Sequence, residues 1–330
     1  MQYRTLGNDL KVSAVGLGCM GFSHAYGAPT EKSEALSAIC AAFDIGYTFF
    51  DTAECYVGTN PDGSISYNEE LVGEALRAHR NEVQIATKFG VRHEGRTIIT
   101  DSRPEVIRNS VEKSLRRLKT DHIDLYYQHR IDKNIPAEEV AGVMSRLIEE
   151  GKITHWGISE ANEEYLRKAD AVCKVTAIQN RYSMMYRDYE SLFPVLEELN
   201  VGFVAFSPMA NGLLSGKYDS GSSFSADDYR SVMPQFTSKA MEENKELLET
   251  LGQIAGSKNA ALSQVSMAWM LCKKPWIVPI PGTRKTERMK ENAGAADIIL
   301  TESEVTALDN ALDNMSMSDV FGGSAIRSGK

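Results

Sequence analysis

The sequence predicts an α/β protein of the (β/α)8 class, a TIM barrel, with an N-terminal β-hairpin and extra C-terminal helices. Eight short apolar segments alternate with helical patterns along the chain. The segments are continuously apolar rather than alternating, which is typical of parallel strands that are buried on both faces. The 330 residues contain no linker or break in composition, so we expect residues 1–330 to form a single barrel domain.

The predicted strands follow a hairpin at Tyr3–Val12, which turns at Gly7-Asn8-Asp9. In order, they lie at Ala14–Cys19, Tyr47–Phe50, Val83–Thr87, Ile123–Tyr127, Ile153–Ile158, Val175–Ile178, Val201–Phe206 and Trp276–Ile280. Active-site residues of such barrels come from the carboxyl ends of the strands. The residues that follow each predicted strand are therefore the first candidates for function.

The predicted helices carry apolar side chains three and four residues apart, the spacing of one helix face. These sets include Leu36, Ile39, Cys40 and Phe43; Leu71, Val72, Ala75 and Leu76; Ile107, Val111, Leu115 and Leu118; Val140, Val143, Met144 and Leu147; Tyr165 and Leu166; and Leu192, Val195, Leu196 and Leu199. Later helices are predicted at Glu242–Ile254, Leu262–Leu271, Thr286–Ala293 and Glu302–Leu312.

Two serine–glutamate pairs and one long polar segment complete the predicted organisation. Ser66 with Glu69, and Ser102 with Glu105, have the spacing of a capping box at a helix start. Ser207–Gln235 is rich in Gly, Ser and Asp and is predicted to be a long loop. A loop of that length inside a compact domain is usually functional or disordered.

The composition limits the possible partners. A net charge of -9 argues against nucleic acid or an anionic membrane as the main partner. No segment has the unbroken apolar length of a membrane helix, and the start MQYRTLGNDLKVSAVG has no apolar signal core. Five cysteines without paired spacing fit a reducing compartment, so we expect a cytoplasmic protein. No two histidines have metal-ligand spacing, so we expect no metal.

Two short motifs resemble known active-site signatures but lack the required context. Residues 16–21 read GLGCMG, which matches the G-x-G-x-x-G of dinucleotide-binding folds, but the loop-like FSHAYGAPT follows instead of a helix. We interpret this motif as a strand end and a tight turn. Residues 157–161 read GISEA, similar to the hydrolase elbow, which requires a histidine after its serine. The last histidine is His155, which excludes a serine hydrolase of this type.

Four polar residues follow three neighbouring predicted strands. Asp51 and Tyr56 follow the second strand in FFDTAECY. Lys88 ends the third strand in IATKFG, and His129 ends the fourth in LYYQHR. Each residue alone has an ordinary structural explanation, such as packing or solvation. Because the carboxyl ends of adjacent barrel strands meet at one rim, however, we expect the four side chains to lie together.

This set resembles the catalytic tetrad of the aldo-keto reductases, NADP-dependent carbonyl reductases on a (β/α)8 barrel, and the resemblance covers nearly the whole chain. YYQHR and GTRKTERMKEN are most similar to the bacterial and plant members of the perakine and pyridoxal reductase type. The resemblance implies NADPH-dependent reduction of an aldehyde or ketone to an alcohol. It implies a small-molecule carbonyl substrate and NADP(H) as the cofactor.

The chemistry of carbonyl reduction explains why these four residue types occur together. Hydride transfer to the carbonyl carbon builds charge on the oxygen, which then needs a proton. Tyr56 is predicted to donate it, although a tyrosine with a pKa of about 10 is a reluctant acid. A nearby Lys88 ammonium favours the tyrosinate, and Asp51 would keep that ammonium charged and aimed. His129, as the neutral imidazole, would orient the carbonyl oxygen.

The resemblance also implies nicotinamide contacts at the ends of later strands. Ser159 and Gln179 match positions that bind the nicotinamide carboxamide, and Phe206 matches the ring that stacks on the nicotinamide. Many relatives carry asparagine after the serine, whereas this chain has Glu160. We therefore assign Glu160 no carboxamide contact.

Basic residues near a helix start point to the remainder of the cofactor. Arg284, Lys285 and Arg288 fit a 2′-phosphate, which favours NADP(H) over NAD(H), and amides at the helix start favour phosphate. The full set of predicted cofactor contacts is Cys19, Met20, Asp51, Ser159, Gln179, Phe206, Ser207, Pro208, Met209, Asn211, Gly212, Leu213, Gly282, Thr283, Arg284, Arg288, Glu291 and Asn292.

Two other functions are compatible with the sequence. One is a cofactor-binding regulatory or redox-sensing subunit with little turnover, similar to the potassium-channel β-subunits of this superfamily; no partner-binding extension is visible, which favours the enzyme. The other is an unrelated (β/α)8 hydrolase or isomerase, which would not bind NADPH. Substrate walls are expected from residues 22–29, Val57–Ile65, Val91–Thr100 and the tail after Met315, whereas the substrate and the oligomeric state are left open.

Overall fold

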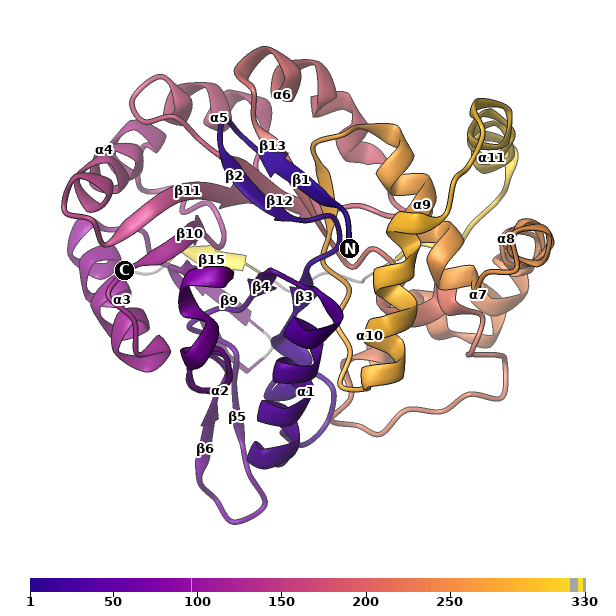
Figure 1. The fold of residues 1–330 in the computed structure, drawn as a ribbon, viewed down its shortest axis with the longest axis horizontal. Helices are drawn as coiled ribbons and strands as arrows, with labels where there is room; N and C mark the ends of the chain where they lie inside the picture. Colours follow the sequence, from indigo (N-terminus) through magenta and orange to yellow (C-terminus); the bar gives the residue numbers. More distant parts are fainter. Residues whose placement is uncertain (96, 321–325, 329–330) are drawn as a thin grey trace.

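The computed structural model describes residues 1–95, 97–320 and 326–328 and confirms the predicted barrel (Figure 1). Eight parallel strands form one sheet in the spatial order β14-β13-β12-β11-β10-β7-β4-β3. Their bounds are β3 (Leu17–Gly18), β4 (Phe49–Asp51), β7 (Gln84–Phe89), β10 (Ile123–Gln128), β11 (Ile153–Ser159), β12 (Ala177–Arg181), β13 (Gly202–Phe206) and β14 (Ile277–Pro279). A parallel bridge between Gly18 and Gly282, and a 2.9 Å hydrogen bond from the Gly16 amide to the Pro279 carbonyl, close the sheet.

Helices surround the strands, and three of them gather on one side of the molecule (Figure 1). The surrounding helices are α1 (Lys32–Ile45), α2 (Asn68–Ala75), α3 (Pro104–Leu118), α4 (Ala137–Glu149), α5 (Glu163–Asp170), α6 (Phe193–Leu199), α9 (Leu262–Lys273) and α10 (Thr286–Ala293). The side group is α7 (Ser238–Glu243), α8 (Lys245–Lys258) and α11 (Glu302–Asn314). Short 3-10 helices are η1 (Met20–Phe22), η2 (Arg77–Glu82), η3 (Asp188–Leu192), η4 (Ala210–Ser215), η5 (Tyr229–Val232), η6 (Pro234–Phe236) and η7 (Gly294–Asp297).

The predicted N-terminal hairpin closes one end of the barrel. Its strands are β1 (Tyr3–Leu6) and β2 (Leu10–Ser13), and its buried Leu6 packs with the side chains that fill the barrel interior. The Ser13 amide donates to Thr48 Oγ1 at 2.9 Å, just before β4 begins. The hairpin therefore covers the end at which the strands start, and the carboxyl ends of the strands open at the opposite rim.

Three short strand pairings lie in segments that were predicted as loops. Strands β5 (Val57–Thr59) and β6 (Ile65–Tyr67) form one antiparallel hairpin, and β8 (Val91–Glu94) and β9 (Thr97–Thr100) form another. Strand β15 (Ile326–Ser328) then pairs in parallel with β9. The chain therefore returns after α11 to a loop that follows β7. Of the predicted substrate walls, residues 96, 321–325 and 329–330 lie outside the described residues.

Both predicted capping boxes are wrong. The first box fails because Glu69 is buried and engaged elsewhere, accepting from Thr87 Oγ1 at 2.6 Å and pairing with Arg117 at 2.6 Å. The second fails because Ser102 Oγ accepts from Gln128 Nε2 at 3.0 Å. These tertiary partners outcompete the local hydrogen bonds, and neither α2 nor α3 has a side-chain cap at its start.

The long segment Ser207–Gln235 is folded against the loop that follows β3. The Tyr229 amide donates to the Ala25 carbonyl at 2.9 Å, and residues 26 and 228 form an antiparallel bridge. The guanidinium of Arg230 pairs with Asp228 at 2.6 Å and lies 4.6 Å from the centre of the Phe224 ring. The segment is therefore held in place by specific contacts, as expected of a functional loop.

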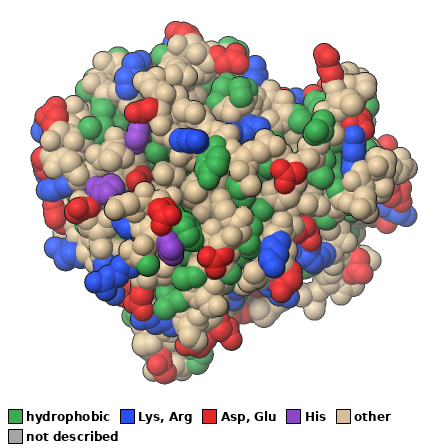
Figure 2. Space-filling view, in the orientation of Figure 1, with side chains coloured by type: hydrophobic (Ala, Val, Ile, Leu, Met, Phe, Trp, Pro, Cys, Tyr) green, Lys and Arg blue, Asp and Glu red, His purple; other side chains and the backbone are tan. Residues whose placement is uncertain are grey.

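Charges are mixed on the face of the molecule that Figure 1 presents. Acidic and basic side chains are interspersed there, and neither sign covers a large area (Figure 2). Apolar side chains on this face form small, separated patches (Figure 2). Within the described part of the chain, no helix has the length and apolar character required to cross a membrane.

Candidate active site

The four polar residues that follow the strands meet at one point of the barrel rim. Strands β4, β7 and β10 are neighbours, with Asp51 opposite Ala86 and Lys88 opposite Tyr127 in the sheet. The fully buried Lys88 Nζ donates to Asp51 Oδ1 at 2.5 Å and to the Tyr56 hydroxyl at 3.3 Å. It also donates to the Thr52 carbonyl at 2.7 Å.

The electrostatics of this group keep the lysine charged. Burial alone would lower the pKa of the Lys88 ammonium, but the Asp51 carboxylate and the Tyr56 hydroxyl outweigh burial and leave the pKa of Lys88 raised. Burial raises the pKa of Tyr56 to about 12, while the Lys88 ammonium acts in the opposite direction. Tyr56 is therefore protonated at neutral pH, beside a cation that stabilises its conjugate base.

His129 lies beside Tyr56 as a neutral imidazole. Its ring meets the Tyr56 ring edge-on, with 5.8 Å between centroids, and its Nδ1 lies 3.5 Å from Cys55 Sγ. Burial, together with the charges of Arg130 and Lys88, holds the pKa of His129 well below its usual range. An uncharged ring here can orient an oxygen by hydrogen bonding without competing with Tyr56 as the acid.

A buried supporting network surrounds the group and was not predicted from the sequence. The Glu54 amide donates to the Lys88 carbonyl at 3.2 Å, and Glu54 Oε1 accepts from the Gly90 amide at 2.9 Å. Asn68 accepts from Thr52 Oγ1 at 2.7 Å through its side-chain oxygen. The network ties the loop that carries Tyr56 to the strand that carries Lys88. The only sequence signal was that Glu54 is a second acidic residue in the FFDTAECY stretch.

Two further imidazoles extend a row of rings away from Tyr56. The His24 ring is stacked on the Tyr56 ring with 6.0 Å between centroids, and His93 lies 5.2 Å from His24. Their segments, the loop after β3 and strand β8, were both predicted to form substrate walls. Among the described residues, no group of three or more His, Cys, Asp or Glu side chains is placed to hold a metal ion.

Two of the predicted nicotinamide contacts already have protein partners. Gln179 Nε2 donates to Asp51 Oδ2 at 2.7 Å, so this amide joins the end of β12 to the Asp51–Lys88 pair. Ser159 Oγ accepts from Arg130 Nη1 at 3.0 Å. Phe206 is half-buried at the end of β13. Glu160 turns away from this group, because its Oε2 accepts from the Tyr189 hydroxyl at 3.0 Å.

The segment after β13 has an unusual backbone that suits an anion. Ser207, Ala210 and Asn211 have left-handed φ values of 51°, 46° and 59°, and Gly212 has a φ of 102°. Such mixed left- and right-handed turns make concave sites in which backbone amides bind phosphate. Asn211 Nδ2 donates to the Tyr26 hydroxyl at 3.0 Å and so fixes the segment to the loop after β3. The remaining predicted contacts here are Pro208, Met209 and Leu213, of which Pro208 and Leu213 are buried.

The segment after β14 brings the predicted basic side chains to the same side of the rim. Arg284 is engaged with the loop after β3, donating to the Gly21 carbonyl at 2.5 Å and to the Tyr26 carbonyl at 3.0 Å. Arg288 Nη1 pairs with Glu291 at 2.5 Å in α10, whereas Lys285 is exposed. Arg284 thus ties the segment after β14 to the loop after β3.

The other predicted contacts have mainly structural positions. Thr283 Oγ1 accepts from the Lys285 amide at 3.1 Å, Gly282 takes part in the bridge that closes the barrel, and Asn292 is buried in α10. Cys19 is buried, and burial raises the pKa of its thiol. Met20 begins η1, so a short turn follows β3 in place of the helix that a dinucleotide-binding motif needs.

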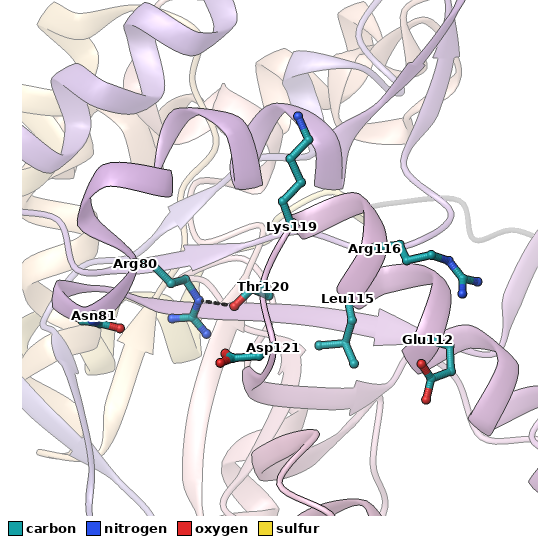
Figure 3. A pocket seen from close by; sticks show the side chains of 8 residues that line it. All are labelled: Arg80, Asn81, Glu112, Leu115, Arg116, Lys119, Thr120 and Asp121. Carbon is teal, nitrogen blue, oxygen red and sulfur yellow. Dashed lines mark hydrogen bonds between the residues drawn. The ribbon is translucent and has the colours of Figure 1, made fainter.

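A surface hollow of about 570 Å³ lies away from this rim (Figure 3). It is lined by Arg80, Asn81, Glu112, Leu115, Arg116, Lys119, Thr120 and Asp121. These residues come from η2, from α3 and from the turn before β10, and so belong to the opposite end of the barrel. Arg80 donates to Thr120 Oγ1 at 2.8 Å and pairs with Asp124 at 2.8 Å, and these contacts hold η2 to the turn before β10.

The sequence of the chain is similar to those of known proteins over nearly its whole length. Residues 14–313 match the Aldo/keto reductase family. The chain is 37% identical over 321 residues to Probable aldo-keto reductase 1 of Glycine max, covering 95% of this chain and 88% of that protein. It is 36% identical over 316 residues to aldo-keto reductase str7 of Strobilurus tenacellus, covering 92% and 90%.

Solved structures show the same similarity in three dimensions. The glycerol dehydrogenase AKR11B4 from Gluconobacter oxydans has a TM-score of 0.84 at 28% identity, over 97% of this chain and 98% of that one. The aldo-keto reductase AKR11C1 from Bacillus halodurans, in its holo form, has a TM-score of 0.77 at 28% identity, over 98% of both chains.

Proposed function

Because this chain belongs to the Aldo/keto reductase family, whose members act on carbonyl groups with nicotinamide cofactors, we propose that it reduces an aldehyde or ketone with NADPH and Tyr56 as the proton donor. The observation that carries the proposal is that the Lys88 ammonium contacts both Asp51 and Tyr56. Its Nζ lies 2.5 Å from Asp51 Oδ1 and 3.3 Å from the Tyr56 hydroxyl. A buried ammonium that contacts both a carboxylate and a phenol stabilises the phenolate that proton donation leaves behind.

In the proposed reaction, bound NADPH supplies the hydride, and the chain's own residues manage the substrate oxygen. The Tyr56 hydroxyl donates its proton to the oxygen as negative charge builds there. The Lys88 ammonium, held by Asp51, stabilises the resulting tyrosinate. His129 donates a hydrogen bond to the same oxygen from its neutral ring and so fixes the carbonyl against Tyr56.

The residues of the rim are suited to hold the cofactor. The left-handed backbone of Ser207, Ala210 and Asn211 offers amides to a pyrophosphate, and Phe206 offers a ring face to the nicotinamide. Ser159 and Gln179 stand where the resemblance puts the carboxamide contacts. Arg288 and Lys285 supply positive charge for a 2′-phosphate at the start of α10, which supports NADPH over NADH.

Turnover tests the proposal directly. We expect the purified chain to oxidise NADPH in the presence of reactive aldehydes such as 4-nitrobenzaldehyde, and a panel of aldehydes, ketones and pyridoxal should rank its substrates. NADPH binding without turnover on any of them would instead support a regulatory or redox-sensing subunit. Absence of NADPH binding would contradict both.

Replacing Arg288 with Ala is expected to weaken NADPH binding at least about tenfold and to leave NADH binding almost unchanged. Only NADPH carries the 2′-phosphate, and a hydrogen bond to a charged group contributes roughly 1.5–3 kcal/mol, or about one to two decades in affinity. Fluorescence titration with both cofactors at low and high salt measures the effect. The salt dependence of NADPH binding should be steeper in the wild type, because a charge contact is screened.

The matched control for Arg288 is Arg116→Ala, which removes an arginine from α3 at the other end of the barrel. This variant should bind both cofactors like the wild type. Equal losses of NADPH and NADH in Arg288→Ala would assign Arg288 to the fold or to the adenine. No loss of either cofactor would mean that the side chain is simply solvated.

A further inference from the structure

Arg130 is a half-buried cation beside the candidate active site, and its charge has no carboxylate partner among the described residues. Its Nη1 donates to the His129 carbonyl at 2.6 Å and to Ser159 Oγ at 3.0 Å. Its guanidinium carbon lies 5.9 Å from the centre of the Phe206 ring. Arg130 therefore touches the catalytic side of the rim and both the carboxamide and the ring positions on the nicotinamide side.

In the described part of the chain, Arg130 lacks the carboxylate partner that two other half-buried arginines of the barrel have. Arg117 pairs with Glu69 at 2.6 Å, and Arg230 pairs with Asp228 at 2.6 Å. Placing a charge in a partly buried site without a counter-ion is unfavourable. A carboxylate partner would also cancel the field of the cation, whereas an uncompensated guanidinium acts on whatever binds next to it.

The neighbouring residue explains why a donor is needed at this position. Glu160, which follows Ser159, cannot donate a hydrogen bond, and its carboxylate is directed elsewhere. Its Oε2 accepts from the Tyr189 hydroxyl at 3.0 Å, and its Oε1 accepts from the Arg181 amide at 3.4 Å. The guanidinium of Arg130, with five N–H donors, is the cation that contacts Ser159 instead.

We propose that Arg130 is a further cofactor residue, which donates to the nicotinamide carboxamide and discriminates against the oxidised cofactor by charge. The inference rests on the proposed function. The nicotinamide ring is neutral when reduced and carries a positive charge when oxidised. A ring stacked on Phe206 would lie in the field of the Arg130 guanidinium, which repels the oxidised form only. The chain would therefore hold NADPH in preference to NADP⁺, release the oxidised product readily and work mainly in the direction of reduction.

The size of the preference follows from Coulomb's law. At a separation of about 10 Å and an effective dielectric constant of about 20, two unit charges repel enough to change affinity roughly tenfold. We therefore expect the ratio of the NADP⁺ and NADPH dissociation constants to be about tenfold larger in the wild type than in a variant without the charge.

The test measures binding of both cofactors to wild type, Arg130→Met, Arg130→Gln and Arg130→Lys by fluorescence titration, without substrate. Arg130→Met should weaken NADPH and lower the NADP⁺/NADPH ratio about tenfold. Arg130→Gln, which keeps a donor but loses the charge, should lower the ratio while losing less NADPH affinity. Arg130→Lys, which keeps the charge, should retain most of the wild-type ratio. Comparing Arg130→Gln with Arg130→Lys therefore tests the charge even if Arg130→Met does not fold.

The control is Arg108→Met, which removes an arginine paired with Glu150 on the outside of the barrel and should leave the ratio unchanged. An unchanged ratio in both Arg130→Met and Arg130→Gln would overturn the inference, even if their turnover fell. A wild type that binds both cofactors and turns over, with a ratio insensitive to Arg130, would leave the proposed function intact. A wild type that binds neither cofactor would instead reject the proposed function itself.

Discussion

Replacing Lys88 with Met is expected to abolish turnover and to lower the free energy of unfolding by roughly 3–5 kcal/mol. The stability loss arises because the buried Asp51 carboxylate would lose the ammonium that now lies 2.5 Å away, so Asp51 must either remain an unpaired buried charge or take up a proton. Activity is lost because the Tyr56 hydroxyl would have no cation to stabilise its conjugate base. Denaturant unfolding and NADPH oxidation on the same preparation measure the two effects.

The pH dependence of the free energy of unfolding tests the charge states of this pair. The pKa of Lys88 is raised in the folded state, so the stability that its ammonium contributes is present below the unfolded pKa of about 10.4 and is lost as the pH rises through the folded value. Burial raises the pKa of Asp51, and removing Lys88 would raise it further, so the buried carboxyl of Lys88→Met takes up a proton that the unfolded chain does not hold above about pH 4. The difference in stability between wild type and Lys88→Met should therefore grow as the pH rises above about 4 and shrink again above about pH 10.4.

Two further variants complete the Lys88 experiment. Asp51→Asn should be milder in both activity and stability, because Lys88 would remain in place and keep its contact with the Thr52 carbonyl. Lys168→Met, which removes an exposed lysine paired with Glu164, should cost about 0–1 kcal/mol and no activity. A fully active Lys88→Met would refute the assignment of the four residues.

The sequence predicted the barrel well because its strands are continuous apolar runs. It missed the elements whose stability depends on distant partners. Strand β15 exists through its pairing of Ile326 with Ile98, more than two hundred positions away, which no local pattern records. The hairpin of β5 and β6 was missed because a segment with Gly58, Gly63 and two serines has the composition of a loop.

The same limit applies to the candidate site. The positions of Asp51 and Lys88 followed from the ends of adjacent strands, since parallel strands in a barrel share a rim. The strand ends did not predict which partners each long side chain would contact. Gln179 stays a predicted cofactor contact, and its hydrogen bond to Asp51 at 2.7 Å was not foreseen. Arg284 likewise stays a predicted phosphate contact, and its hydrogen bonds to two carbonyls of the loop after β3 were not foreseen.

Replacing Tyr56 with Phe is expected to lower the rate of carbonyl reduction by about 10²- to 10⁴-fold, the usual contribution of general acid catalysis. The change removes one hydroxyl, which accepts a 3.3 Å hydrogen bond from Lys88 Nζ. The ring contacts with His129 and His24 can persist, so the free energy of unfolding and the affinity for NADPH should change little. Lys88 also keeps its bond to Asp51, which separates this variant from Lys88→Met.

The Tyr56 prediction is checked by measuring kcat and the NADPH dissociation constant on the same protein, with Tyr3→Phe as the control. Tyr3 is an exposed tyrosine on the hairpin at the other end of the barrel, and its loss should change neither quantity. A large fall in kcat at constant NADPH affinity means that the hydroxyl acts on the reacting substrate and not on cofactor binding. If Tyr56→Phe keeps most of its kcat, the proton comes from another group. His129, edge-on to Tyr56 at 5.8 Å, would then be the next residue to replace, because its ring lies beside Tyr56 and is proposed to donate a hydrogen bond to the same oxygen.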